Sequence, residues 1–195
     1  MQTQPTTFTP CVLCLAGAPL HGKTTIAKML ANRSNLHAID VDDIRHAALP
    51  KAFELQGGSF SGFEHNLMVT AYSTAAEFAR RLIGAGQPVI LSGPYSETEF
   101  KNPLRVLTGD LGNLVPFRFF RLNINSLEII RQRIERRQAS GRPAVIATEE
   151  QYRRALEFQG DWWESAPLHE IDGSGTIEEV SGTILQLCHD LILSS

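Results

Sequence analysis

Cysteine is scarce in this chain of 195 residues, which contains only Cys11, Cys14 and Cys188. An odd, low count argues against a disulfide framework and is typical of proteins in a reducing compartment. Cys11 and Cys14 have the spacing of some metal and redox sites, but they lie in the apolar run 11–16. Side chains three residues apart on a strand point to opposite faces, so we expect both cysteines to pack in the core.

The chain also lacks long apolar runs and an excess of basic residues. No stretch approaches the roughly 20 apolar residues that a membrane-spanning helix needs. Residues 1–10 contain two prolines, no lysine and no arginine, so we expect a flexible N-terminal tail rather than a targeting segment. The formal net charge of −3 provides no general attraction to polyanions. These absences predict a cytoplasmic protein with no membrane partner. They also argue against nucleic acid as a partner.

The composition suits one globular domain with a continuous core, since 43% of the residues are hydrophobic and 20% are charged. We therefore expect a single domain over residues 11–195. Within it, short apolar runs alternate with segments of helical periodicity. The sequence predicts five strands, at 11–16, 36–40, 88–91, 117–122 and 168–172.

Helical patterns fill most of the intervals between the predicted strands. Ser96, Thr148 and Thr176 open capping-box patterns, in which a hydroxyl side chain and an acidic or amide side chain satisfy the first free amides of a helix. Residues 50–63, with several glycines and serines, favour a loop. The predicted helices are 23–32, 64–84, one that begins near 96–99, 127–138, 148–158 and 176–193.

Strands that alternate with helices predict an α/β fold, in which a parallel sheet is covered by helices on both faces. Crossovers in such folds are right-handed, and ligands bind beyond the carboxyl ends of the strands. A glycine-rich turn, Asp42 and Gly93 each follow a predicted strand. We therefore expect the functional side chains to meet at one edge of the sheet.

The segment after the first predicted strand has the pattern G-x-x-x-x-G-K-[ST] of a phosphate-binding loop, and a predicted helix follows it. Glycines let the backbone curl until its amides face phosphate oxygens, and the helix N-terminus adds partial positive charge. We expect Lys23 to be exposed on this loop and to reach the β- and γ-phosphates of ATP. We expect Thr24 to bind Mg²⁺, which prefers oxygen ligands. The expected nucleotide-binding residues are Gly17, Ala18, Pro19, Leu20, His21, Gly22, Lys23, Thr24 and Thr25.

His21 occupies a variable position of this pattern, and we expect it to be a passive loop residue rather than a catalytic base.

A cluster of carboxylates and one arginine follows the second predicted strand. Phosphoryl transfer to a hydroxyl benefits from a carboxylate that accepts the proton and orients the oxygen, and Asp42 is our first choice for this base. Asp40 is a candidate for holding Mg²⁺ through water, whereas Asp43 can be no more than a helix cap. Arg45 can bind an anionic group of the acceptor or the transferring phosphoryl. A solvated helix N-terminus would use the same residue types, so the cluster alone does not establish a site.

Arginines crowd the predicted helix at 127–138, where Arg133 and Arg137 lie four residues apart and share a face. We expect at least one arginine of this helix to neutralise charge on the transferring group. The alternative is a solvated face, balanced by the glutamates of the same helix. Residues 138–147 include one glycine and one proline, Gly141 and Pro143, and can form the hinge of a lid.

A phosphate-binding loop followed by a strand that ends in Asp-Asp-x-Arg resembles the small P-loop kinases, in particular the polynucleotide-kinase-like, gluconate-kinase-like and zeta-toxin-like group. The resemblance extends in order over residues 11–193. It implies a three-layer αβα P-loop fold with a five-stranded parallel sheet of order 2-3-1-4-5. It also implies ATP and Mg²⁺ as donor and cofactor, and a small, mobile helical lid over about 131–150.

The same resemblance implies roles for particular residues. It implies that Asp42 is the general base, that Arg45 is the arginine of the family pattern, and that Arg133 and Arg137 touch the phosphates or stack on the adenine. It also places residues 172–175 near the adenine.

One departure from the family pattern concerns the metal, because Ser92-Gly93-Pro94 stands where many P-loop proteins carry an acidic residue. We therefore expect Thr24, the ATP phosphates and water to hold Mg²⁺ together with Asp40 or Asp42.

The acceptor side is the least readable part of the sequence. We expect it to include residues 46–66 and the turn after the third strand. Phe60, Phe63 and His65 can line a pocket there, or they can be incidental aromatic residues of a surface loop. Trp162-Trp163 is weak evidence for nucleic acid in the absence of a basic groove. The sequence favours an ATP-dependent kinase that acts on a hydroxyl of a small molecule, such as a metabolite, sugar, antibiotic or nucleoside. The alternatives are a polynucleotide 5′-hydroxyl kinase and a P-loop ATPase or nucleotide-binding protein without a phosphoryl acceptor.

Overall fold

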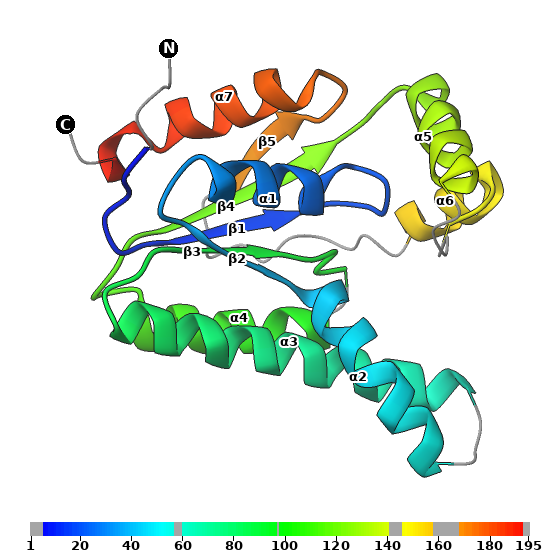
Figure 1. Cartoon of the computed structure of the whole chain (residues 1–195), viewed down its shortest axis with the longest axis horizontal. Coiled ribbons are helices and arrows are strands. Elements are labelled where there is room, and N and C mark those ends of the chain that lie inside the picture. The colour runs from blue at the N-terminus through cyan, green and yellow to red at the C-terminus, as the bar shows by residue number, and fades with distance from the viewer. Residues whose placement is uncertain (1–5, 57–59, 97, 141–145, 158–167, 193–195) are drawn as a thin grey trace.

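The computed structural model describes residues 6–56, 60–96, 98–140, 146–157 and 168–192, with side chains outside 49–64 (Figure 1). Five parallel strands form one sheet in the order β2-β3-β1-β4-β5, which is the order expected from the family resemblance. The strands are β1 (Val12–Ala16), β2 (His37–Asp40), β3 (Val89–Ser92), β4 (Phe117–Asn123) and β5 (Leu168–Asp172).

The central strand β1 explains why the sheet can be parallel and covered on both faces. All five of its side chains are buried, and β3 and β4 pair with it on its two sides. A near-continuous apolar run of this kind suits a strand that contacts helices above and below. Cys11 and Cys14 are buried and free, as expected for core residues.

Helices cover both faces of the sheet (Figure 1). On one face lie α1 (Lys23–Asn32) and α7 (Ile177–Leu187); on the other lie α3 (Phe60–Gly84) and α4 (Thr98–Leu111). Each face has its own apolar core. The remaining helices are α2 (Val41–Gln56), α5 (Leu127–Ala139), α6 (Glu149–Glu157) and the short 3₁₀ helix η1 (His189–Leu191).

A third, smaller core lies beyond the carboxyl edge of the sheet, where α5 and α6 pack (Figure 1). It joins a residue of the glycine-rich loop and a residue after β4 to the inner faces of the two helices. Its buried members are Ala18, Ile124, Ile130, Ile134, Ile146 and Tyr152. The α5–α6 region is therefore anchored directly on the loop that follows β1.

Two of the predicted capping boxes are present. Thr176 and Glu179 exchange both hydrogen bonds at the start of α7. At the start of α6, the Gln151 amide donates to the Thr148 hydroxyl, and the Thr148 amide donates to the Gln151 side chain, both at 3.2 Å. The sequence pattern was sufficient here because both partners lie within three residues of each other.

The predicted loop over 50–63 is wrong for most of its length. Helix α2 continues to Gln56, and α3 begins at Phe60. Residues 51–56 contain lysine, alanine, glutamate and leucine, which have good helix propensity, and the glycine signal is confined to a short interval between the two helices. The last helix is also shorter than predicted, because α7 ends at Leu187 and η1 follows it.

The expected tail is not a tail over residues 6–10; residues 1–5 lie outside the described part of the chain. Phe8 is buried in the core beneath α1 and α7. Its amide donates to the Asn35 side chain at 2.7 Å, and its carbonyl accepts from the same side chain at 3.0 Å. Phe8 also forms an antiparallel bridge with Ile192. The buried side chain and the backbone of Phe8 thus fix an otherwise polar segment to the connection between α1 and β2 and to Ile192. Among the described residues, no helix is long and apolar enough to cross a membrane.

Candidate active site

The loop between β1 and α1 has the curled backbone that the phosphate-binding pattern predicts. Gly17 and Gly22 have φ angles of 136° and 92°, and Leu20 has a φ of 69°. A Cβ atom on Gly17 would lie 2.5 Å from the carbonyl oxygen of Leu122, so this position has no room for a side chain. The loop is thus held against the end of β4 by a contact that only glycine permits.

Lys23 is the first residue of α1 and is buried, with 8% of its surface exposed, rather than exposed as expected. Its ammonium group donates to the carbonyl of Ala18 at 2.9 Å, inside the loop. Burial lowers the pKa of Lys23 to about 8; the carboxylates of Asp42 and Asp40 oppose this shift, and Arg137 adds to it. The lysine therefore lies near Asp40, Asp42 and Arg137, three of the residues that the sequence singled out.

Other residues of the loop differ in exposure. Ala18 is buried, Pro19 and Leu20 are half-buried, and Thr25 is exposed on the first turn of α1.

Asp40 is the hub of the hydrogen bonds at the end of β2. Its Oδ2 atom accepts the hydroxyl of Thr24 at 2.7 Å and the hydroxyl of Ser92 at 2.5 Å. Its Oδ1 atom accepts the backbone amides of Asp42 and Asp43 at 2.9 and 3.3 Å. Asp40, rather than Asp43, therefore caps the start of α2.

The oxygen atoms of Thr24 and Asp40 form a pair that suits a hard cation such as Mg²⁺. Within the described ranges, no three side chains of histidine, cysteine, aspartate or glutamate cluster closely enough to hold a metal by themselves. The donor set therefore fits an ion that is shared between the protein and a phosphate ligand. It does not fit a closed metal centre.

Asp42 and Arg45 form an ion pair at the start of α2, with Oδ1 and Nη2 3.2 Å apart. The Asp42 side chain is 46% exposed and that of Arg45 only 15%. The Nε atom of Arg45 is buried and has no hydrogen-bond partner among the described residues. Asp43 takes no part in this pair, since it contacts Lys28 at 3.0 Å on the surface.

The two arginines expected on one face of α5 both approach the loop. Arg133 donates to the carbonyls of Leu20 and Gly173, each at 2.8 Å, and so bridges the glycine-rich loop and the turn after β5. Arg137 lies close enough to Lys23 to lower its pKa, and its Nε atom is buried without a partner among the described residues. Arg131 instead pairs with Glu149 of α6 at 2.7 Å.

His21 holds a position that the sequence pattern did not reveal. It is 3% exposed, and its Nδ1 atom lies 2.5 Å from the carbonyl oxygen of Leu122. Its Nε2 atom lies 2.7 Å from the hydroxyl oxygen of Tyr152, on α6. Burial lowers the pKa of His21 to about 4, and the nearby cations Lys23 and Arg133 also lower it. No local sequence signal connects two residues this far apart in the chain.

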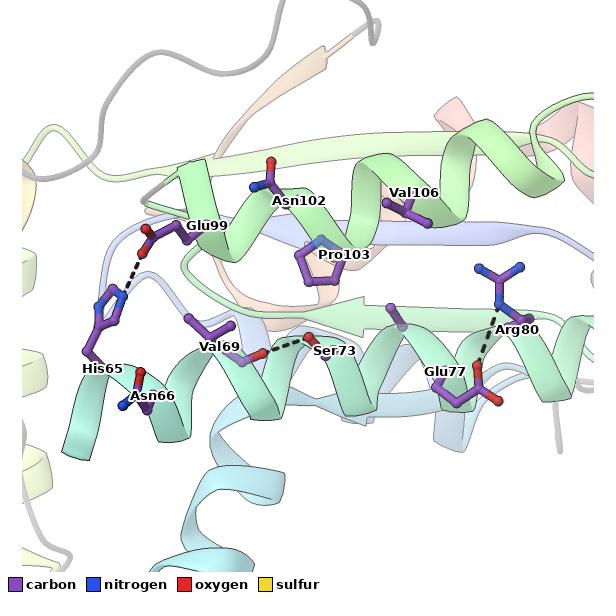
Figure 2. A pocket seen from close by; sticks show the side chains of 11 residues that line it. His65, Asn66, Val69, Ser73, Glu77, Arg80, Glu99, Asn102, Pro103 and Val106 are labelled. Atoms are coloured by element: carbon purple, nitrogen blue, oxygen red, sulfur yellow. Dashed lines mark hydrogen bonds and ion pairs between the residues drawn. The ribbon is translucent and has the colours of Figure 1, made fainter. Parts of the chain in front are cut away.

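A groove of about 630 Å³ lies elsewhere, between α3 and α4 (Figure 2). His65 lines it and contacts Glu99 at 2.6 Å. Neither the glycine-rich loop nor residues 40–45 contribute to its lining, so it is separate from the site described above. The side chains of Phe60 and Phe63 lie outside the described residues, as do Gly141, Pro143 and Trp162-Trp163.

Comparisons with known proteins point to one fold. No protein-family model and no curated protein sequence matches the chain. A sugar kinase from Janibacter sp. is similar in structure, with a TM-score of 0.62, 19% identity and coverage of 93% of this chain and 94% of that one. A gluconokinase from Sinorhizobium meliloti has a TM-score of 0.61 and 14% identity, with coverage of 93% of this chain and 95% of that one. The Mycobacterium tuberculosis APS kinase, solved in complex with AMPPNP and APS, has a TM-score of 0.59 and 14% identity, with coverage of 95% of this chain and 99% of that one. The chain therefore has the fold of the small P-loop kinases.

Proposed function

We propose that the protein is an ATP-dependent kinase that transfers the γ-phosphoryl group of ATP to a hydroxyl group of a small-molecule acceptor. The observation that carries this proposal is the placement of the Asp42–Arg45 pair beside the buried ammonium of Lys23. A phosphate-binding loop alone would serve a nucleotide-binding switch equally well. A carboxylate beside the loop lysine, partly open to solvent, supplies what a hydroxyl acceptor needs in addition.

The donor nucleotide would lie along the glycine-rich loop. The loop amides and Lys23 would bind its phosphates, and Lys23 would exchange the Ala18 carbonyl for a phosphate oxygen. The Nε atom of Arg137, which is buried and has no hydrogen-bond partner in the described part of the chain, would donate to the same phosphates. Arg133, which bridges the loop and Gly173, would contact the same nucleotide. The AMPPNP complex of the similar APS kinase supports ATP as the donor.

Thr24 and Asp40 would hold Mg²⁺ next to the phosphates. A hydroxyl group has lone pairs besides its proton, so Thr24 can keep its hydrogen bond to Asp40 while its oxygen faces the cation. The cation supplies neutralisation of negative charge on the phosphates. Asp40 itself is fixed by Ser92 and by two backbone amides, which keeps its carboxylate oriented.

Asp42 would act on the acceptor. In transfer, the acceptor oxygen forms a bond to the γ-phosphorus, the bond from that phosphorus to the bridging oxygen of ADP breaks, and the hydroxyl proton passes to the Asp42 carboxylate. The side chain of Asp42 is exposed enough for an acceptor to reach it. Arg45, held beside it, would bind an anionic group of the acceptor or the transferring phosphoryl.

The proposal is tested by measuring ADP release with and without a panel of hydroxylated metabolites, sugars, antibiotics, nucleosides and oligonucleotides. We expect ADP release to rise with one class of small acceptor, and mass spectrometry to find that acceptor heavier by one phosphoryl group. Turnover that no acceptor stimulates would contradict the proposal and favour an ATPase. A response that grows with oligonucleotide length would favour a polynucleotide kinase.

A further inference from the structure

His21 connects the glycine-rich loop to two other parts of the fold at once. One ring nitrogen contacts the backbone at the end of β4, and the other contacts Tyr152 on α6. We propose that His21 is a positioning residue that joins the phosphate-binding loop to α6 through Tyr152, so that nucleotide binding in the loop and the placement of the α5–α6 region are coupled. The inference rests on the nucleotide binding of the proposed function.

The partners fix the direction of both hydrogen bonds. The carbonyl of Leu122 can only accept, so Nδ1 of His21 must carry a proton. A neutral imidazole then has a lone pair on Nε2, and the hydroxyl of Tyr152 must donate to it. The chain of donors therefore runs from Tyr152 through the imidazole to β4, and it requires the neutral form of His21. Its low pKa, about 4, maintains that form at neutral pH.

The packing around His21 leaves it little freedom to move independently. A Cβ atom on Gly17 would come within 3.4 Å of Nδ1, so the loop backbone lies directly against the ring. The Gly173 position is equally close to the carbonyl of His21, because a Cβ atom there would lie 3.3 Å from that oxygen. A shift of the loop that moves His21 must therefore move Tyr152 or break the bond to it.

The two helices of the α5–α6 region are also joined to each other, so we expect them to move together. Glu149 of α6 pairs with Arg131 of α5 at 2.7 Å. Ala18 of the loop and Tyr152 belong to the same small core. The charged groups that face His21 are Lys23 on α1 and Arg133 on α5, and Tyr152 is the titratable group that faces it from α6. Both cations are also expected to contact the nucleotide, so His21 connects residues of the expected nucleotide site to α6.

The nucleotide-free protein gives the first test. Nitrogen-15 NMR of the His21 ring should find the proton on Nδ1 and the ring neutral at pH 7. A ring with its proton on Nε2 would overturn the proposed order of donors. In hydrogen exchange of the α6 amides, His21→Asn and Tyr152→Phe should each speed exchange about fivefold, the effect expected for one neutral hydrogen bond. The double variant should be no faster than either single variant, because all three lack the same contact. Additive effects would overturn the proposal.

Addition of ATP and Mg²⁺ gives the second test. In the wild-type protein, amide exchange should slow both in residues 17–24 and in residues 149–157. In Tyr152→Phe the slowing in 17–24 should remain, whereas that in 149–157 should shrink about fivefold. His21→Asn can still reach Leu122 but not Tyr152, so the slowing in 149–157, relative to that in 17–24, should shrink in the same way. Full protection of 149–157 in Tyr152→Phe would overturn the coupling.

Arg154→Gln is the matched control on α6. It removes the exposed pair with Glu150, of similar length to the Tyr152 contact, without touching the loop. We expect it to retain the response of 149–157 to nucleotide. If the wild-type loop shows no response to ATP, the proposed function fails. If the loop responds and α6 does not, the proposed function stands and this inference fails.

Discussion

Asp40 and Ser92 lie opposite each other in the paired strands β2 and β3, and the carboxylate of Asp40 accepts the serine hydroxyl at 2.5 Å. The acidic residue that many P-loop proteins carry at the end of the third strand is a serine in this chain. The neighbouring strand supplies a carboxylate at the same height of the sheet, and that carboxylate also accepts the hydroxyl of Thr24. Although the third strand ends in a serine, the phosphate-binding loop therefore still has a carboxylate beside it, that of Asp40.

Asp40→Asn should weaken binding of ATP with Mg²⁺ by about tenfold and should raise the Mg²⁺ concentration needed for half-maximal turnover. The amide keeps the size of the side chain but removes the negative charge beside Thr24. Calorimetric titration with ATP at several Mg²⁺ concentrations measures both effects. An unchanged Mg²⁺ requirement would argue that Asp40 is only the cap of α2.

Asp42→Asn should lower kcat by about 10²–10⁴-fold and leave the dissociation constant of ATP nearly unchanged, because a base acts in the transition state. Kinetics with the identified acceptor and calorimetry with ATP separate the two quantities. Asp43→Asn is the control, since Asp43 lies in the same turn and contacts only surface Lys28 among the ion pairs of the described residues. A parallel loss of nucleotide affinity in Asp42→Asn would assign Asp42 to the metal.

Binding of ATP should weaken as the pH rises above about 8. The pKa of Lys23 is about 8 in the free protein, and phosphate binding requires the ammonium form. Phosphate raises the pKa of the bound lysine, so affinity should be constant below pH 8 and fall by up to tenfold per unit above it. Calorimetry between pH 6 and 10 measures this slope. Lys23→Ala should abolish transfer and remove the slope, whereas exposed Lys28→Ala should retain both.

Gly17→Ala should destabilise the protein by about 1–3 kcal/mol and abolish nucleotide binding. The new methyl group would lie 2.5 Å from the Leu122 carbonyl, at a φ of 136° that side chains rarely adopt. Gly182→Ala is the matched control within α7, where a Cβ atom meets nothing within 4 Å. Alanine there should stabilise the helix by about 0.5–1 kcal/mol. Thermal unfolding of the two variants measures the contrast.

The wild-type protein should lose stability as the pH falls from about 6.5 to 4. His21 has a pKa of about 4 when folded and an ordinary value of 6.5, so the unfolded chain binds the extra proton in this interval. At 1.36 kcal/mol per pH unit, the contribution approaches about 3 kcal/mol. Lys23, Arg133 and Tyr152 face the imidazole, and protonation would repel the two cations and break the bond from Tyr152. In urea unfolding at a series of pH values, the free energy of unfolding of His21→Asn should fall less steeply between pH 6.5 and 4. An equally steep fall would contradict the assignment of this pH dependence to His21.

The elements nearest the phosphate-binding loop could be predicted from the sequence because their signals are local. β1, the loop and α1 follow from a buried apolar run, a glycine pattern and helical periodicity within about 20 residues. The order of the strands came from the family resemblance, since no local pattern specifies which strands pair. The end of α2 was predicted as a loop because the glycine pair after it favours a loop, although the residues before the pair favour a helix.

The residues of the candidate site could be predicted from the sequence, but the contacts between them could not. The sequence identified Lys23, Asp40 and Asp42, but it did not show that Lys23 is buried or that Asp40 binds Ser92. The contact of His21 with Tyr152 was invisible for a physical reason. It depends on how α6 packs on the loop, and packing between distant segments leaves no periodic trace in the sequence.

The bridge between Phe8 and Ile192 brings the two ends of the described chain together, on the side of the sheet away from the phosphate-binding loop (Figure 1). A short peptide could join these ends, and new termini could then be opened at the turn around Leu114, whose side chain is 75% exposed. A circular permutant of this kind would keep every side chain of the phosphate-binding edge in place while changing the order in which the strands are synthesised.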